Sequence, residues 1–218
     1  MELVLVDVDG TLIDGQSYTS VLQEIWQQRW RRPRLAGLLA RRLPFQALRK
    51  LRLVDRLQNQ ERWARGMAWL LAAAPVAEVQ GLMHAACGRL VPRMRQQVVA
   101  ELAEHRRVGR RVCLASTAVE PVLEALAPFV PADAWVGTRL AVRDGRYTGE
   151  LEGPPCNGAV KLRYVEESIG SGIDWAESYA YSDGLPDLPM LERVGHAVLV
   201  DPDSALALVA GPRGWRVL

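Results

Sequence analysis

Short apolar runs alternate with amphipathic stretches along most of this 218-residue chain. Each run is rich in Val, Leu and Ala, and it is followed by a polar or glycine-bearing turn and then by apolar residues at helical spacing. This order is typical of a parallel β-sheet that helices cover on both faces, so we expect an α/β fold. The pattern predicts strands near 2–8, 111–116, 134–138, 178–182 and 197–200, and helices near 93–107, 119–127, 158–169, 187–194 and 203–210.

A long helical segment interrupts this alternation after the first strand. From Ser17 to Leu90 the sequence shows helical spacing and no strand signal, which is far more chain than one crossover connection needs. We therefore expect a core domain formed by residues 1–14 and 91–218, with an inserted helical domain at 15–90. About four helices fit this insertion. Three prolines are expected to separate them: Pro33, Pro44 and Pro75.

A second interruption is the segment "LAVRDGRYTGEL", Leu140–Leu151, which alternates apolar and polar residues around Asp144-Gly145. The Asp-Gly pair favours a two-residue hairpin turn. We expect this segment to form a β-hairpin attached to the sheet.

The charges of the chain nearly cancel, with 27 basic and 25 acidic residues, so the composition does not require a nucleic-acid partner. Ten of the basic residues lie between Arg29 and Arg56, against the single acid Asp55. Trp30 and Phe45 are interleaved with them. Such a segment is compatible with a solvated helix surface, a funnel for anionic substrates, or a face that lies on a membrane surface. The sequence alone leaves these three roles open.

The cysteines and the apolar runs indicate a compartment. The cysteines are odd in number, far apart and never in a C-x-x-C pair, which argues against a disulfide framework or a zinc site: Cys87, Cys113 and Cys156. Asp7 and Asp9 interrupt the first apolar run, so we expect no signal peptide. The longest apolar window, 67–77, contains a proline and is too short to span a bilayer. We expect a cytoplasmic protein.

Two pairs of carboxylates follow predicted strands. Asp7 and Asp9 end the first strand, and because residues i and i+2 of a strand point the same way, both project to one site. Asp183 and Asp187 follow the strand near 178–182. In an open parallel sheet, ligands bind beyond the carboxyl ends of the strands. A turn at Asp9-Gly10 and a helix-capping role for the second pair are the alternative interpretations.

Four carboxylates at neighbouring strand ends suit a hard cation with oxygen ligands, which favours Mg²⁺ over Zn²⁺. The histidines show no ligand spacing and support no Ser-His-Asp triad, so we expect them to be core or surface residues: His84, His105 and His196. The sequence therefore predicts a magnesium site at this edge of the sheet.

Two further polar residues are expected at the same edge. Ser116 ends its predicted strand, where its hydroxyl and the following amides can hold an anion, although a serine there is also an ordinary helix N-cap. Lys161 lies early on a predicted helix and is one of two lysines in the chain, the other being Lys50. A solvated helical lysine is the alternative interpretation. The chain otherwise uses arginine for its positive charges. We therefore expect that a lysine stands at position 161 because the site needs a compact ammonium charge.

Together these positions resemble the haloacid dehalogenase-like superfamily of phosphatases, over essentially the whole chain. The first family motif, D-x-D-G-T-L, stands here as "DVDGTL" at 7–12. The second motif is Ser116, the third is Lys161, and the fourth is the acidic pair Asp183 and Asp187. The insertion resembles the family's C1-type cap domain on a Rossmann-like parallel sheet. The hairpin, the fourth motif and the C-terminal tail resemble the phosphoserine-phosphatase-like branch, subfamily IB.

The resemblance implies a mechanism and a role for each residue. Asp7 would attack the phosphorus of a small phosphorylated metabolite and form an aspartyl-phosphate, while Asp9 would protonate the leaving group. Mg²⁺ would bind to Asp7, to the backbone carbonyl of Asp9 and to Asp183, with Asp187 orienting this shell. The phosphoryl oxygens would be bound by four residues: Gly10, Ser116, Thr117 and Lys161.

The substrate-binding positions depart from those of phosphoserine phosphatases. These enzymes typically carry a glutamate shortly after the first motif, which holds the amino group; here Gln16 and Ser17 stand in that region. Glu24 lies too far along the next helix to be a good substitute for that glutamate. Thr117-Ala118 follow Ser116, where phosphoserine phosphatases typically have Gly-Gly, and Gly184 stands where the family often has Ser or Thr. The resemblance therefore does not imply phosphoserine as the substrate.

Three other functions stay open at this point. A phosphatase of phospholipid-type phosphomonoesters at a membrane surface would use the basic segment. A phosphotransferase or mutase would need a second phosphate site in the cap. A catalytically silent binding protein usually lacks one of the first-motif aspartates, and both are present here. The sequence predicts no oligomeric state.

Overall fold

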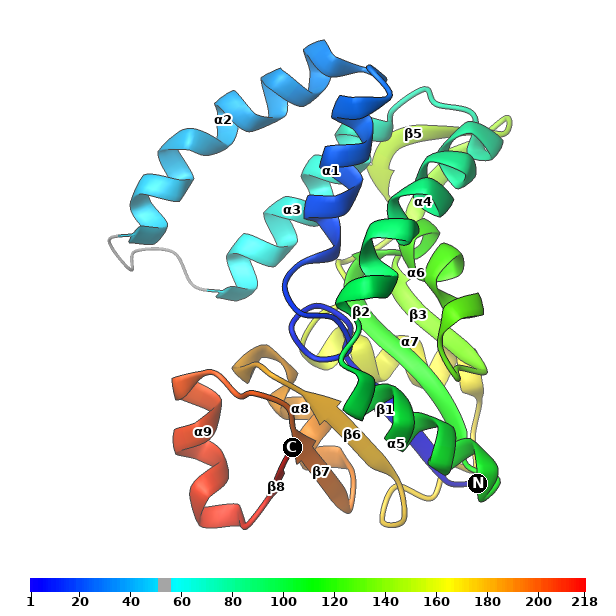
Figure 1. Cartoon of the computed structure of the whole chain (residues 1–218), viewed down its shortest axis with the longest axis vertical. Coiled ribbons are helices and arrows are strands. Elements are labelled where there is room, and N and C mark those ends of the chain that lie inside the picture. The colour runs from blue at the N-terminus through cyan, green and yellow to red at the C-terminus, as the bar shows by residue number, and fades with distance from the viewer. Residues whose placement is uncertain (51–55) are drawn as a thin grey trace.

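A six-stranded parallel sheet forms the centre of the molecule (Figure 1). The computed structural model describes residues 1–50 and 56–218, and the side chains outside 42–57. The strands lie in the order β3-β2-β1-β6-β7-β8, and each neighbouring pair is parallel. Their bounds are β1 Leu3–Val6, β2 Arg111–Val119, β3 Ala134–Thr138, β6 Tyr179–Ser182, β7 His196–Leu199 and β8 Arg216–Val217.

The expected α/β fold is confirmed, and five of these strands lie where the sequence predicts them. The strand β8 has no counterpart among the predicted strands, because two residues are too few to show a pattern. The strand β2 continues to Val119, beyond its expected end at Ser116.

Helices cover both faces of the sheet. Val4 and Val6 of β1 pack with α5 and α6, whereas Leu3 and Leu5 pack with α7, α8 and α9. All four side chains are fully buried, which is why β1 reads as a continuous apolar run instead of an alternation. The helices are α5 Gln96–Arg107, α6 Glu120–Leu126, α7 Ala159–Ile169, α8 Leu188–Arg193 and α9 Ser204–Ala210. Short 3-10 helices lie at Val91–Arg93, Ala127–Phe129, Leu185–Asp187 and Gly211–Arg213.

Helices α1 to α4 are inserted between β1 and β2 (Figure 1). Their bounds are α1 Ser17–Gln27, α2 Arg32–Lys50, α3 Arg56–Leu71 and α4 Val76–Leu90. Pro33 lies in the first turn of α2, and Pro75 is the residue before α4, both positions where a missing N–H costs little. The expected break at Pro44 is wrong, since α2 continues through that position. A proline removes one intrahelical hydrogen bond, and a helix of 19 residues retains the rest.

The inserted helices share their apolar core with the sheet. One continuous cluster joins Val4 of β1 and Leu123 of α6 to Ile25 of α1, Leu70 of α3 and Met83 of α4. The insertion at 15–90 and the rest of the chain are therefore packed tightly against each other. Their division into two domains stays a prediction.

Part of the basic segment has a structural role. Arg31 and Arg34 donate hydrogen bonds to the carbonyl oxygen of Ala72, and Arg31 also donates to that of Leu70. These carbonyls belong to the C-terminal end of α3, where guanidinium groups complement the helix dipole. The side chains of 42–57 lie outside the described residues, so the other roles considered for this segment stay open.

The expected hairpin is present as β4 Leu140–Arg143 and β5 Arg146–Leu151. Asp144 and Gly145 both have positive φ, 49° and 70°, as the turn requires. The hairpin forms its own two-stranded sheet and packs on the insertion. A Cβ at Gly149 would lie 2.6 Å from the Cβ of Ala72, so only glycine permits this close approach.

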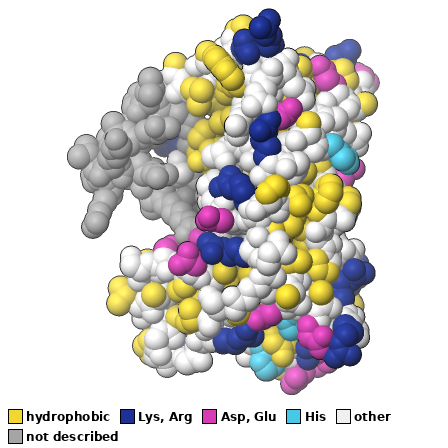
Figure 2. Space-filling model, in the orientation of Figure 1, with side chains coloured by type: hydrophobic (Ala, Val, Ile, Leu, Met, Phe, Trp, Pro, Cys, Tyr) yellow, Lys and Arg dark blue, Asp and Glu magenta, His cyan; other side chains and the backbone are white. Residues whose placement is uncertain are grey.

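Figure 2 shows basic and acidic side chains interspersed over the visible described surface, in keeping with the nearly balanced charge. Among the described helices, none has the combination of length and apolar character needed to cross a membrane.

Candidate active site

The predicted site residues meet at the carboxyl edge of the three central strands. Val6, the last residue of β1, pairs with Leu114 of β2 and with Tyr181 of β6. The next residue, Asp7, continues this register and donates its backbone N–H to the carbonyl of Tyr181 at 3.0 Å. Since parallel strands end at the same edge, side chains that are more than a hundred residues apart in sequence come together here.

A tight loop follows β1 and brings the backbone against Asp183. Leu12 donates its N–H to the carbonyl of Asp7, and Gly10 donates to that of Ile13. Gly10 has φ +96°, and a Cβ there would lie 2.4 Å from the Oδ2 atom of Asp183. The hydroxyl of Thr11 donates to Oδ1 of Asp183 at 3.3 Å. The first and fourth motifs are thus in direct contact. The alternative of a hairpin turn at Asp9-Gly10 is wrong, because the chain continues into α1.

Lys161 binds two of the carboxylates. Its Nζ lies 2.7 Å from Oδ1 of Asp7 and 2.6 Å from Oδ1 of Asp187, and its side chain is 2% exposed. Burial lowers the pKa of Lys161, but the carboxylates of Asp187 and Asp7 outweigh burial, so the net pKa lies above its usual range. Lys161 therefore remains charged at all ordinary pH values. The alternative of a solvated helical lysine is excluded.

Asp187 accepts a further hydrogen bond from the hydroxyl of Ser182, at 2.7 Å. It precedes α8, but its side chain caps no backbone N–H. Its partners are Lys161 and Ser182, so the helix-capping alternative is wrong for this residue.

The two first-motif carboxylates have raised pKa values. Burial raises the pKa of Asp7 to about 8, opposed by Lys161 and reinforced by Asp187 and Asp183. Burial raises the pKa of Asp9 to about 6, opposed by hydrogen bonds from Ser17. Asp9 is therefore protonated in most molecules only below about pH 6, while a cation placed against Asp7 would favour the ionised form of Asp7.

Ser17 contacts Asp9, although in the sequence it stands out only as a departure from the family. Its backbone N–H donates to Oδ1 of Asp9 at 2.7 Å, and its hydroxyl donates to Oδ2 at 3.1 Å. Ser17 begins α1, so the first turn of the inserted helices holds the Asp9 carboxyl in place. The one sequence signal for this role is a serine at a predicted helix start.

Ser116 lies inside β2 and is 1% exposed. It does not cap α6, which begins four residues later, so the N-cap alternative is wrong. Its hydroxyl accepts the N–H of Ala118 at 3.2 Å. The pairing of β2 with β3 shifts between Ala115 and Val119, which bends the strand end at Ser116 and Thr117. Both residues line the same pocket as Asp7 and Asp9.

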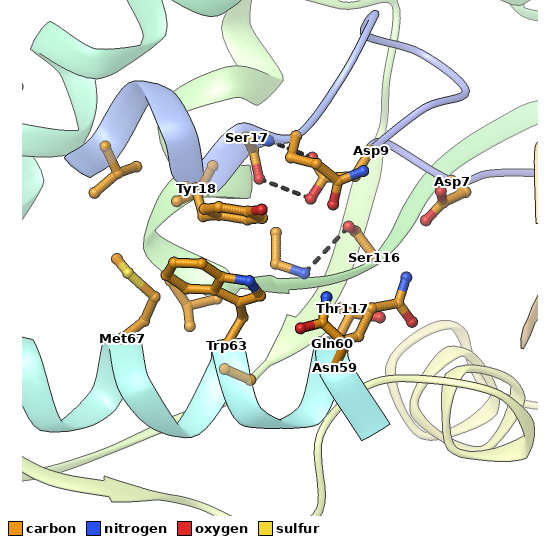
Figure 3. Close-up of a pocket in the computed structure, with 16 residues that line it drawn as sticks. Asp7, Asp9, Ser17, Tyr18, Asn59, Gln60, Trp63, Met67, Ser116 and Thr117 are labelled. Carbon is orange, nitrogen blue, oxygen red and sulfur yellow. Dashed lines mark hydrogen bonds between the residues drawn. The ribbon is translucent and has the colours of Figure 1, made fainter. Parts of the chain in front are cut away.

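The pocket lies between the sheet edge and the inserted helices, and it encloses ≈ 560 Å³, part of it open to solvent. Figure 3 shows Asp7, Asp9 and Ser116 at one end, with Tyr18 and Trp63 beside them and Met67 farther away. Its lining residues are Asp7, Asp9, Gln16, Ser17, Tyr18, Val21, Asn59, Gln60, Trp63, Ala64, Met67, Ser116, Thr117, Ala118, Val119 and Val122. The sequence pattern does not identify the residues of α3 among them, since helical spacing does not report which helix covers a strand end.

Several other candidate residues lie elsewhere. Glu24 is bound by Arg89 of α4 at 3.1 Å and does not line the pocket. His105 is buried against the hydroxyl of Tyr181 at 2.8 Å, and none of the three histidines lines the pocket. The cysteines are buried and unpaired.

The charges at this edge are unbalanced. Four carboxyl groups lie near Lys161, and each offers oxygen atoms that can bind a metal ion. They belong to Asp7, Asp9, Asp183 and Asp187. No group of three or more His, Cys, Asp or Glu side chains within the described residues is arranged as a metal cage. The expected donor set has a different form, with two carboxylates and one backbone carbonyl, and such a set leaves positions for water, as Mg²⁺ requires.

Known proteins resemble this chain in sequence. A probable phosphatase of Mycobacterium tuberculosis is 36% identical over 151 residues, which cover 68% of this chain and 52% of that protein. A phosphoserine phosphatase of Halobacterium salinarum is 30% identical over 205 residues, covering 93% of this chain and 87% of that protein. The chain thus spans about half the length of the mycobacterial relative.

Solved structures share the fold. A protein of unknown function from Bordetella pertussis Tohama I superposes with a TM-score of 0.83 at 26% identity, covering 100% of this chain and 97% of that chain. A substrate-bound phosphoserine phosphatase superposes with a TM-score of 0.62 at 17% identity, covering 100% and 92%.

The family itself follows from the sequence match. Residues 4–192 match the sequence model of the haloacid dehalogenase-like hydrolases. This range contains the loop at 7–12, Ser116, Lys161 and both acids of the fourth motif. The chain belongs to the haloacid dehalogenase-like hydrolase family, with the phosphoserine-phosphatase-like character that its motifs and its haloarchaeal relative indicate.

Proposed function

We propose that this protein is a phosphomonoester phosphatase that uses Mg²⁺ and forms an aspartyl-phosphate on Asp7. The observation that carries the proposal is the buried contact of Lys161 with Asp7 and Asp187, beside Ser116 and the loop that holds Asp183. A carboxylate fixed next to an ammonium group and a hydroxyl suits in-line attack on a phosphoryl group, because phosphoryl transfer mainly requires positioning and charge neutralisation.

In the first step, an Asp7 carboxylate oxygen forms a bond to phosphorus while the bond from phosphorus to the leaving alcohol oxygen breaks. Asp9 gives its proton to that oxygen, so the product leaves as a neutral alcohol. In the second step, Asp9 takes a proton from water, whose oxygen displaces Asp7 and releases inorganic phosphate. The raised pKa of Asp9, about 6, suits a group that must carry the proton first and accept it afterwards.

The phosphoryl oxygens need donors on the side opposite the leaving group. We assign this role to the Lys161 ammonium, the Ser116 hydroxyl, and the backbone around Gly10 and Thr117. Lys161 can serve only if it stays protonated, and its two carboxylate partners ensure this.

Mg²⁺ fits the excess of carboxylates over cations at this edge. Asp7, the backbone carbonyl of Asp9 and Asp183 would hold it, and Asp187 would act through Lys161 and Ser182. When bound, the ion supplies positive charge against the phosphoryl oxygens and lowers the pKa of Asp7.

The inserted helices, residues 15–90, form the cap domain in this proposal, and residues 1–14 and 91–218 form the core. We further propose a small-molecule substrate and a cytoplasmic location. The three buried, unpaired cysteines support a reducing compartment, and several relatives are named as phosphatases. A mutase is less well supported, because no described residue that lines the pocket is a Lys or Arg for a second phosphate.

The test is release of inorganic phosphate from acetyl phosphate and from a set of alkyl phosphates, with Mg²⁺ and with a chelator. We expect release that requires the metal and that Asp7→Asn abolishes. Asp144→Asn, in the exposed hairpin turn, is the matched control and should retain wild-type rates. Metal-independent release, or equal rates for wild type and Asp7→Asn, would contradict the proposal.

A further inference from the structure

Two inserted helices form the wall of the pocket next to the carboxylates. Tyr18 of α1 and Trp63 of α3 stack on each other, with ring centroids 4.0 Å apart and an angle of 20° between the rings. Figure 3 shows both side chains with their polar ends toward Asp9 and Ser116. The aromatic pair thus offers a flat apolar surface to a leaving group attached to phosphorus beside Asp7.

Several further lining residues are apolar. Met67 of α3 lies beyond the pair, and the other apolar lining residues include Val21 of α1, Ala64 of α3, Val119 of β2 and Val122 of α6. A surface of this kind stabilises apolar or planar groups through removal of area from water. It offers no hydrogen bonds from side chains to a strongly polar group.

One lining residue has an unused acceptor. The side-chain oxygen of Gln60, Oε1, is buried and has no hydrogen-bond partner within the described part of the chain. A buried carbonyl oxygen without a donor is costly, so such an atom in a pocket indicates a donor on the ligand. Gln60 thus indicates an O–H or N–H group on the substrate.

The charges of the pocket lie at one end. Among the described lining residues, only Asp7 and Asp9 have carboxyl groups, and none is Lys, Arg or His. Phosphoserine would bring an ammonium and a carboxylate group that both need partners when buried. Glu24, the acid considered above as a substitute for the glutamate that holds an amino group in phosphoserine phosphatases, is bound by Arg89 outside the pocket.

Building on the proposed phosphatase function, we propose that the substrate is the phosphate monoester of an uncharged alcohol with an apolar or planar body and a hydrogen-bond donor for Gln60. Both a monoacyl glycerol phosphate and a nucleoside monophosphate have this chemistry. The aromatic pair and the Met67 end contact the body of the alcohol, and Gln60 accepts the hydrogen bond from its donor.

The experiment compares kcat/KM of the whole chain for five phosphate esters, with Mg²⁺ present. They are short-chain lysophosphatidate below its micellar concentration, a nucleoside 5′-monophosphate, hexyl phosphate, phosphoethanolamine and phosphoserine. We expect lysophosphatidate or the nucleotide to exceed phosphoserine at least about tenfold, the effect of one unpaired buried group. Whichever of lysophosphatidate and the nucleotide has the higher kcat/KM shows whether the alcohol is a monoacyl glycerol or a nucleoside.

Two variants at position 60 test the donor directly. Gln60→Leu should lower kcat/KM of the best donor-bearing ester relative to hexyl phosphate, which has no donor on its alcohol, by about tenfold. Gln60→Glu should raise kcat/KM for phosphoethanolamine relative to kcat/KM for that ester, because the new carboxylate pairs with the ammonium group of phosphoethanolamine. Gln23→Leu, at an exposed position of α1, is the matched control and should leave all ratios unchanged.

The outcomes separate this inference from the function on which it rests. The inference would be overturned by a preference for phosphoserine, or by a ratio of the donor-bearing ester to hexyl phosphate that Gln60→Leu does not change. In either case, Asp7-dependent hydrolysis of acetyl phosphate would still support the phosphatase function. Absence of Asp7-dependent release from every ester and from acetyl phosphate would remove both.

Discussion

The sheet edge and the pocket wall formed by the inserted helices are built in different ways. At the sheet edge, Asp7, Lys161 and Asp187 are joined by ionic contacts of 2.6 and 2.7 Å and are almost fully buried. In the helical wall, Tyr18 of α1 and Trp63 of α3 meet through ring stacking, and Gln60 of α3 also lines the pocket.

This difference separates chemistry from specificity. Charged contacts with short distances tolerate few substitutions, since removal of one partner leaves another charge buried. Apolar walls tolerate changes of shape at small cost, so they can be altered to suit another alcohol. We therefore expect large kinetic effects at the edge and changes in substrate ratios at the helices.

The largest expected effect is at Lys161. Lys161→Met should lower kcat/KM by about 10²–10³-fold, because a donor to the phosphoryl oxygens is lost. It should also destabilise the fold by about 3 kcal/mol, because Asp7 and Asp187 lose their shared counter-charge. Steady-state kinetics and urea unfolding measure the two effects. Arg163→Met, at a more exposed site on the same helix, is the control, and a Lys161→Met enzyme with wild-type kcat/KM would contradict the assignment.

The next effect is at Asp9 and depends on pH. With an alkyl phosphate, Asp9→Asn should lower kcat by about 10²-fold, since the leaving alkoxide is no longer protonated. The proton is present below the pKa of about 6, so the ratio of wild-type to variant rates should fall as pH rises above 6. Titration of the substrate cancels in this ratio. A ratio that is constant from pH 5 to 8 would assign the proton to another group.

The smallest effect is at Glu24, within the inserted helices. Glu24→Gln should reduce stability by about 1 kcal/mol, through loss of its partly buried pair with Arg89. The phosphoserine-to-hexyl phosphate ratio of kcat/KM should not change. Glu104→Gln, in an exposed pair with Arg107, is the comparison for stability. A selective loss of phosphoserine hydrolysis in Glu24→Gln would show instead that Glu24 contributes to substrate binding.

Most of the sheet and the edge chemistry can be predicted from the sequence. Apolar runs such as Leu3–Val6 are local signals, and the residues after them are placed by the strand itself. Parallel strands share an edge, so the apolar pattern alone groups Asp7, Ser116 and Asp183. The four inserted helices and the hairpin also follow from local pattern, and they lie within the expected ranges 15–90 and 140–151.

Other features depend on contacts between distant segments. The two residues of β8 become a strand only by pairing with β7. The continuation of β2 through Ser116 depends on its shifted pairing with β3, and the hydrogen bonds from Ser17 to Asp9 depend on how α1 leaves the first loop. Apart from the serine at the start of α1, none of these contacts has a signal in the letters of one segment.

The sequence by itself determined which acids, which hydroxyl and which ammonium group stand at the edge of the sheet, because the period of a strand and the shared edge of parallel strands are local rules. Only the tertiary structure decided that Lys161 contacts both Asp7 and Asp187, and that Tyr18, Gln60 and Trp63 line the pocket. Helical spacing defines the buried face of a helix but not the element that covers it, and that choice is made by packing of the whole chain.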